Sequence, residues 1–350
     1  MVNTDIQRVN HIIRTWFSDH IRLITLVGFI TLAIPAGILV FLAIVGAGLV
    51  AHTWVIAFLM ASICLVTIRG MYFEWHAVIR APRIEAVSDH RMVGIMLGIV
   101  GGTLVTFGLS VEFGIHPIVA ASMTGVVAAI VLARLAVPIY CGAFVGMTAP
   151  LLFPTYGHSV IAGVIAVLVY LIAQPVFYGV GGKLGTTAFV GTTATVALTA
   201  GEFFVEPVPD LGPILLIIGY STVAAPLTFA LHVRLPFHPV FASGIVGGAA
   251  GLGLPILYGE PGLLIAASVY AASFAGMASS SRVPNEGWML ICGVIVGLLF
   301  VYTMPYLGGS GGKLGTIGFI ACLAMYGTLG SVRVIRIKQH IARKPHRDIS

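Results

Sequence analysis

The sequence predicts an all-α polytopic membrane protein with about twelve transmembrane helices, in which two N-terminal helices precede a five-plus-five inverted repeat with broken or kinked helices. Of its 350 residues, 58% are hydrophobic and only 9% are charged, whereas soluble domains carry about 25% charged residues. Apolar stretches recur near the length of about 20 residues that crosses a hydrocarbon core. The hexapeptide GGKLGT occurs twice, at 181–186 and 311–316.

Charges, prolines and glycine clusters divide the chain into apolar segments that lack the alternation of a transmembrane β-barrel. The predicted helices cover 23–45, 50–68, 92–113, 117–133, 138–154, 158–178, 184–201, 211–231, 238–257, 263–281, 286–306 and 314–332. The segments 138–154 and 263–281 are short or rich in proline, glycine and serine, so the sequence leaves open whether they cross the membrane fully.

Charged residues predict the orientation, because basic residues concentrate in cytoplasmic loops. With a cytoplasmic N-terminus and full crossings, only Lys313 among the basic residues lies outside, together with Glu202, Glu206, Asp210 and Glu260. The basic residues on the cytoplasmic side include Arg69, Arg80, Arg83, Arg91, Arg134, Lys183, Arg234, Arg282 and those of the tail, Arg333, Arg336, Lys338, Arg343, Lys344 and Arg347. We therefore expect a plasma (inner) membrane protein with both termini in the cytoplasm.

The two GGKLGT copies belong to a longer internal repeat with an offset of 130 (313 − 183). At this offset the matched pairs include Tyr140 and Tyr270, Phe144 and Phe274, Pro154 and Pro284, and Pro175 and Pro305. Upstream, HPIVAASMTG at 116–125 aligns with HPVFASGIVG at 238–247, and the extra loop around 257–262 accounts for the change of offset. Five predicted segments separate the two lysines, and an odd number inverts the second copy. Inverted repeats recur in transporters, whose sites lie where broken helices meet.

These boundaries predict five regions along the chain. They are an N-terminal part with two helices and a basic loop (1–91), repeat one (92–201), an acidic outer loop (202–210), repeat two (211–332) and a basic cytoplasmic tail (333–350).

Each GGKLGT turn has the parts of an anion cradle. Glycines let a ligand approach the backbone closely, successive N–H groups form a concave anion site, and the helix that follows adds the positive end of its dipole. The lysine adds a full charge and the threonine a hydroxyl. We expect one cradle on each face, formed by Gly181, Gly182, Lys183, Gly185, Thr186, Gly311, Gly312, Lys313, Gly315 and Thr316. The alternative is that the glycines permit close helix packing and the lysines extend to the lipid headgroups.

Further candidates lie at matched positions of the two copies. His116 and His238 each precede a proline at a predicted helix start, where they can cap the helix or titrate near neutral pH in the pathway. Phe144 and Phe274 can narrow a pore from both sides. Helix-end hydroxyls that can contact a solute, or serve only close helix packing, are those of Thr148, Ser279 and Ser280.

The predicted function is a channel or transporter for a small anion. Every Asp and Glu lies in a predicted loop or at a segment end, and since buried carboxylates usually carry protons and metal cations, the pattern argues against a cation pump. Three alternatives stay open: a conduit for a small neutral solute such as urea, a membrane-embedded enzyme that uses His116, His158 or His238, and a structural membrane subunit. We expect the lipid bilayer and a small solute as partners, no nucleic acid, no metal and no cofactor; a homo-oligomer is left open.

Overall fold

The computed structural model describes residues 21–50, 54–80 and 89–342. Within these ranges the chain is helical apart from its connections and one isolated bridge between Phe204 and Gly308. The helices are α2 (Ile21–Val50), α3 (Trp54–Arg80), α4 (Asp89–Val111), α5 (Pro117–Val131), α6 (Ala136–Gly146), α7 (Tyr156–Ile172), α8 (Lys183–Leu198), α9 (Leu211–Val233), α10 (Pro239–Tyr258), α11 (Glu260–Gly276), α12 (Glu286–Thr303) and α13 (Lys313–Ala342). The predicted charges at Arg83, Arg343, Lys344 and Arg347 lie outside the described residues.

Each predicted segment corresponds to one of these twelve helices, but only seven are long and apolar enough to cross a membrane. The other five, α5, α6, α7, α8 and α11, have 11 to 17 residues. The segment predicted over 138–154 overlaps the shortest of these, the 11-residue α6, which begins at Ala136. At 1.5 Å per residue such a helix is about 17 Å long, which is less than the hydrocarbon thickness. The architecture is therefore a multi-pass helical one that combines long and short helices.

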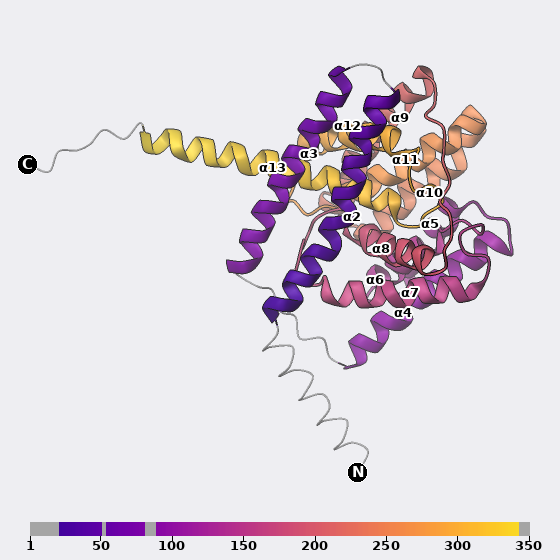
Figure 1. The fold of residues 1–350 in the computed structure, drawn as a ribbon. Helices are drawn as coiled ribbons and strands as arrows, with labels where there is room; N and C mark the ends of the chain where they lie inside the picture. The colour runs from indigo at the N-terminus through magenta and orange to yellow at the C-terminus, as the bar shows by residue number, and fades with distance from the viewer. Residues whose placement is uncertain (1–20, 51–53, 81–88, 343–350) are drawn as a thin grey trace, which may run out of the picture.

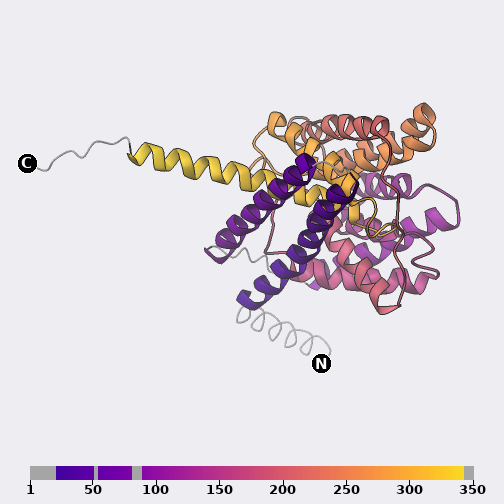
Figure 2. The ribbon, with the colours of Figure 1, turned by 45° about the horizontal axis from the view of Figure 1, so that its top comes forward.

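The long N-terminal helices lie together beside the rest of the helices. Figure 1 shows α2 and α3 side by side, with α13 beginning among the central helices and extending well beyond them toward the C-terminus. In Figure 2 the magenta helices of the first half and the orange helices of the second half form two neighbouring groups. Helix α13 packs against α3, α8 and α11, so it joins the N-terminal pair to both groups.

Proline residues end two helices rather than kink them. Helix α7 ends at Ile172, shortly before Pro175, and α12 ends at Thr303, shortly before Pro305. Proline lacks the N–H group that a continuing helix requires. The chain then forms an irregular loop, and a new helix begins at the lysine of each GGKLGT sequence.

The two loops have the same backbone pattern at matched positions. Phe177 and Leu307 have φ values of 53° and 54°, Gly179 and Gly309 have 71° and 76°, and Gly182 and Gly312 have 79° and 85°. These left-handed conformations are costly for a side chain with a Cβ, which explains the glycine at the last residue before each helix. The residues before α8 and α13 thus reverse the chain in the same way.

Helices α8 and α13 cross in their first turns, at Gly185 and Gly315. A Cβ added to Gly185 would lie 2.4 Å from the Cα of Gly315, and one added to Gly315 would lie 2.5 Å from the Cα of Gly185. Gly182 and Gly312 likewise contact the opposing helix. The expectation of one glycine turn on each membrane face is therefore wrong. A turn that must admit another backbone has no room for side chains, and the two turns meet in the interior.

Four aromatic side chains pack beside this crossing. Ring centroids are 4.3 Å apart within the Tyr140–Phe144 pair and within the Tyr270–Phe274 pair, and 4.6 Å apart between Phe144 and Phe274. All four side chains are at most 2% exposed. The matched phenylalanines thus come from α6 and α11 to one contact between the two halves of the chain.

Replacing either crossing glycine by alanine should destabilise the fold. Gly185→Ala or Gly315→Ala places a methyl group against a backbone that cannot move aside, and overpacking of this kind costs about 1–3 kcal/mol. The matched control is Gly253→Ala in α10, where nothing lies within 4 Å of the added Cβ. Thermal unfolding of the purified protein in detergent measures the effect, and equal melting temperatures for all three variants would contradict the crossing.

Candidate functional site

A cavity of about 250 Å³ lies beside the second glycine turn. Its lining includes Lys313 at the start of α13, His116 before α5, Phe144 of α6, Phe274 of α11 and Glu206 of the connection between α8 and α9. The remaining lining residues are Ile118, Met147, Leu263, Leu264, Ala267, Phe300, Met304, Gly309, Ser310, Gly311, Gly312, Leu314 and Gly315. A lysine, an imidazole and a carboxylate thus meet among largely apolar walls.

Lys313 is 8% exposed and holds the loop that precedes its own helix. Its Nζ donates to the carbonyl oxygen of Tyr306 at 2.6 Å and to that of Met304 at 3.5 Å. An ammonium group has three donors, so two carbonyls leave one donor for a solute. The first-turn N–H groups of an α-helix have no partner within the helix, and Leu314 and Gly315 of this turn also line the cavity.

His116 caps α5 at the edge of the cavity. Its Nδ1 accepts a hydrogen bond from the N–H of Ile118 at 3.4 Å, and His238 caps α10 in the same way at 3.3 Å from Val240. Burial lowers the pKa of both imidazoles, which favours the neutral form that can accept this bond. Both histidines therefore have the predicted capping geometry, and only His116 lines the cavity.

Lys183 in the first GGKLGT turn makes the same two hydrogen bonds as Lys313 in the second turn. Lys183 Nζ donates to the carbonyl oxygen of Val176 at 2.6 Å and to that of Gln174 at 3.5 Å. The threonines do not present free hydroxyls, because Thr186 donates to Gly182 O at 3.3 Å and Thr316 to Gly312 O at 3.2 Å. These two hydroxyls therefore bond their own helices instead of pointing donors at a solute.

The structure brings seven of the sequence-predicted residues to the cavity lining: His116, Phe144, Phe274, Gly311, Gly312, Lys313 and Gly315. Thr148 lies directly behind it, where its hydroxyl accepts a hydrogen bond from the N–H of Gly311 at 3.2 Å. The predicted residues that do not line it are Thr148, Gly181, Gly182, Lys183, Gly185, Thr186, His238, Ser279, Ser280 and Thr316. The cavity is thus built mostly around one copy of the repeated motif.

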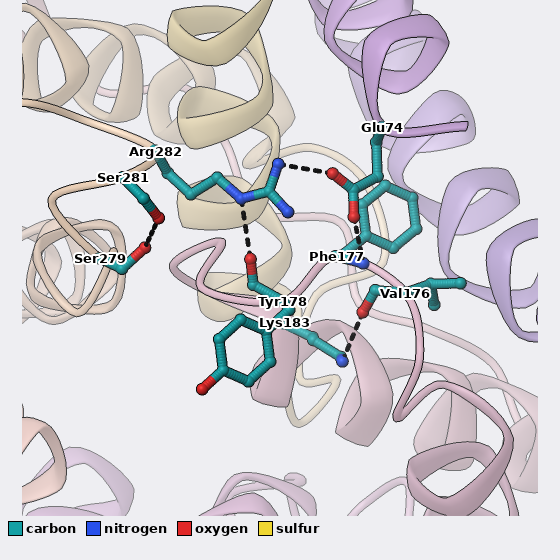
Figure 3. Close-up of polar contacts among 8 residues, drawn as sticks. All are labelled: Glu74, Val176, Phe177, Tyr178, Lys183, Ser279, Ser281 and Arg282. Atoms are coloured by element: carbon teal, nitrogen blue, oxygen red, sulfur yellow. Dashed lines mark hydrogen bonds and ion pairs between the residues drawn. The ribbon is translucent and has the colours of Figure 1, made fainter. Parts of the chain in front are cut away.

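A buried ion pair lies near the first glycine turn (Figure 3). Glu74 of α3 is 1% exposed, and its Oε2 lies 2.5 Å from Nη1 of Arg282. Its Oε1 accepts a hydrogen bond from the N–H of Phe177 at 2.7 Å, and Arg282 Nε donates to the carbonyl oxygen of Tyr178 at 2.8 Å. Together the two side chains hold the loop between α7 and α8.

The position of Glu74 overturns the prediction that no carboxylate lies within a membrane span. Cutting the second segment at Arg69 placed this residue in a loop, but α3 continues to Arg80. The sequence signal that could have found it is the continuation MYFEWHAVI, which is apolar except for Glu74 and His76. A buried acid removes the sequence-based objection to proton or cation coupling.

The loops before α8 and α13 are held by different partners. Ser279 N–H donates to Gly179 O at 2.9 Å, and at the matched positions Ala149 N–H donates to Gly309 O at 2.9 Å. Beyond this shared contact, the first loop uses the side chains of Glu74 and Arg282, whereas Gly308 of the second exchanges two backbone hydrogen bonds with Phe204. Within the part of the chain that the structure describes, and apart from the lysine that follows each loop, charged side chains from other elements thus form hydrogen bonds with the first loop and not with the second.

Ser279 and Ser280, predicted as solute contacts, lie on the Arg282 side of the molecule. Ser279 Oγ is 2.8 Å from Ser281 Oγ, and Ser280 is exposed. Figure 3 shows Ser279 and Ser281 beside Arg282, away from Lys183.

Comparison of the chain with protein-family models, with curated proteins and with solved structures finds no match.

Removing one member of the buried ion pair should cost much more stability than removing both. Glu74→Leu leaves the Arg282 guanidinium without its carboxylate, and loss of one partner of a buried pair costs about 3–5 kcal/mol. In the double variant Glu74→Leu/Arg282→Met no unpaired charge remains, so the melting temperature should recover in part. As a control, Glu286→Gln breaks the surface pair with Arg234 and should leave the melting temperature nearly unchanged. Additive effects of the two single changes would contradict this coupling.

Proposed function

We propose that this protein is a membrane transporter or channel for a small anion, which binds in the cavity beside Lys313. The observation that carries the proposal is the cavity itself, where a buried lysine, first-turn residues of α13 and the imidazole of His116 meet. Anions are favoured at helix N-termini, because the unpaired N–H groups and the helix dipole are both positive there.

Glu206 supplies a countercharge to Lys313 in the same cavity. A permeating anion must therefore compete with this carboxylate for the lysine. The competition limits how tightly the anion is held, and conduction requires binding that is strong enough for entry and weak enough for release.

We infer that the two halves form an inverted repeat, with the two N-terminal helices outside it. Support comes from the matched φ values before α8 and α13, the matched lysine contacts, the matched histidine caps and the reciprocal crossing at Gly185 and Gly315. In this arrangement the short helices α6, α8 and α11 meet near the middle of the membrane. Broken helices of this kind place backbone groups at membrane depth only where protein or a cavity surrounds them.

The inverted arrangement predicts that matched loops reach opposite sides of the membrane. Leu151 and Ser281, which are 130 positions apart (281 − 151), are both exposed. In intact cells an impermeant thiol reagent should modify only one of Leu151→Cys and Ser281→Cys, each in a background without the native cysteines. Modification of both variants from the same side would refute the inversion.

Anion flux should depend on the charge in the cavity. In proteoliposomes loaded with halide, nitrate, phosphate or a small carboxylate, Lys313→Gln should reduce flux of the transported anion by about tenfold, because loss of a charge–charge contact of about 1.4 kcal/mol changes an equilibrium tenfold. Glu206→Gln should instead lower the half-saturating anion concentration, because it removes the competing carboxylate. Unchanged flux in Lys313→Gln, with the protein still folded, would dismiss the anion site.

One observation favours a second candidate, a conduit for a small neutral solute such as urea. Lys313 Nζ already has two carbonyl partners, and the walls around it are mostly apolar. The same proteoliposomes separate the two functions, because flux of a neutral solute does not respond to membrane potential whereas uncompensated anion flux does.

A further inference from the structure

The two GGKLGT turns differ in how exposed the residue before each turn is, although their backbone conformations match. Ser310 precedes the second turn and lines the cavity. Val180, at the matched position before the first turn (310 − 130), is only 6% exposed. If the two turns belong to one pathway, as the proposed function requires, the pathway is open on the Ser310 side and closed on the Val180 side.

Arg282 ties together three elements on the closed side. Its guanidinium contacts Glu74 of α3 and donates to Tyr178 O in the loop before α8. It also lies over the ring of Tyr326 in α13, 4.6 Å from the ring centroid. Figure 3 shows the side chain reaching across from its own loop toward Glu74. Separation of α3, α13 and the α7–α8 loop therefore requires this one residue to release its partners.

Among the described residues, the loop before α13 has no corresponding ion pair. The position that matches Arg282 (282 − 130) is Leu152, which is 3% exposed and carries no charge. Glu74 belongs to α3, outside the repeated region, so nothing in the repeat supplies a counterpart. The ion pair is an addition to one side only.

A purely structural role explains these charges poorly. Replacement of a buried ion pair by apolar groups is often neutral or stabilising, and ionisable residues at membrane depth usually have a functional role. A buried pair can switch between two discrete arrangements, formed and broken, and apolar packing offers no comparable switch.

We propose that the Lys183 turn is the second mouth of the solute pathway, and that the Glu74–Arg282 ion pair is the gate that holds this mouth shut. The proposal rests on the transport function above. It adds that the anion leaves or enters past Lys183 once Arg282 releases Glu74 and Tyr178.

The test compares thiol labelling of Val180→Cys and Ser310→Cys in a background that lacks the four native cysteines. Purified protein in nanodiscs is treated with a hydrophilic methanethiosulfonate reagent, which reaches both sides. With the ion pair intact, Ser310→Cys should react and Val180→Cys should be protected. Adding Glu74→Gln, or separately Arg282→Gln, should raise the labelling rate of Val180→Cys by about tenfold or more, because a tenfold population shift needs a bias of only about 1.4 kcal/mol.

Two controls separate gating from general loosening. Glu286→Gln breaks the exposed Arg234–Glu286 pair and should leave both labelling rates unchanged. A protein that retains only Cys322, which is 0% exposed, should stay unlabelled when Glu74→Gln is added. Labelling of Cys322 would mean that the variant is unfolding, and Arg282→Gln alone would then decide.

Faster labelling of Val180→Cys with slower labelling of Ser310→Cys supports a gate that alternates between the two sides, and faster labelling of Val180→Cys alone supports a gate in a channel. Three results would overturn the proposal. The first is an equal labelling rate of Val180→Cys with and without the ion pair, and the second is rapid labelling of Val180→Cys with the pair intact. The third is labelling of Cys322 in both the Glu74→Gln and the Arg282→Gln variants. The labelling experiment uses no solute, so its outcome does not depend on whether the protein transports anions. A failed labelling test would likewise leave the anion-flux test unaffected.

Discussion

The requirement that backbone groups be paired inside an apolar environment governs this structure. Helices α7 and α12 end within the fold, and the loops that follow would leave carbonyl groups without partners. In each loop, the lysine that starts the next helix donates hydrogen bonds to the carbonyl groups seven and nine residues earlier in the chain. An unpaired polar group in hydrocarbon costs several kcal/mol, so the broken helices depend on these two ammonium groups.

The same requirement explains why charge gathers on one side. The loop before α13 finds further partners in Phe204, Ala149 and Thr148, and none of these residues is charged. The loop before α8 uses the carboxylate of Glu74 and the guanidinium of Arg282. Two loops with matched φ values thus share a lysine contact but differ in their other partners, because only the loop before α8 also contacts a carboxylate and a guanidinium from other elements of the described structure.

Sequence patterns predicted the helical class and singled out the two GGKLGT turns. They succeeded there because glycine before a helix start and proline after a helix end directly restrict the backbone conformation. They failed where tertiary packing decides. Cutting the chain at Arg69 hid Glu74, since a helix with a buried partner tolerates a carboxylate that hydropathy treats as a boundary. The contact between Gly185 and Gly315 was missed for a related reason. A local motif shows that a backbone must approach closely, but it does not show that this backbone belongs to the other GGKLGT turn. The inversion of the two halves stays a prediction.

The glycine crossing between α8 and α13 has a mechanical consequence. Interlocked side chains resist rotation of one helix over another, because every knob must leave its hole. At Gly185 and Gly315 two bare backbones touch instead, so a small change of crossing angle there displaces no side chain at the point of contact. The contact at the two glycines therefore resists a change of crossing angle less than interlocked side chains would.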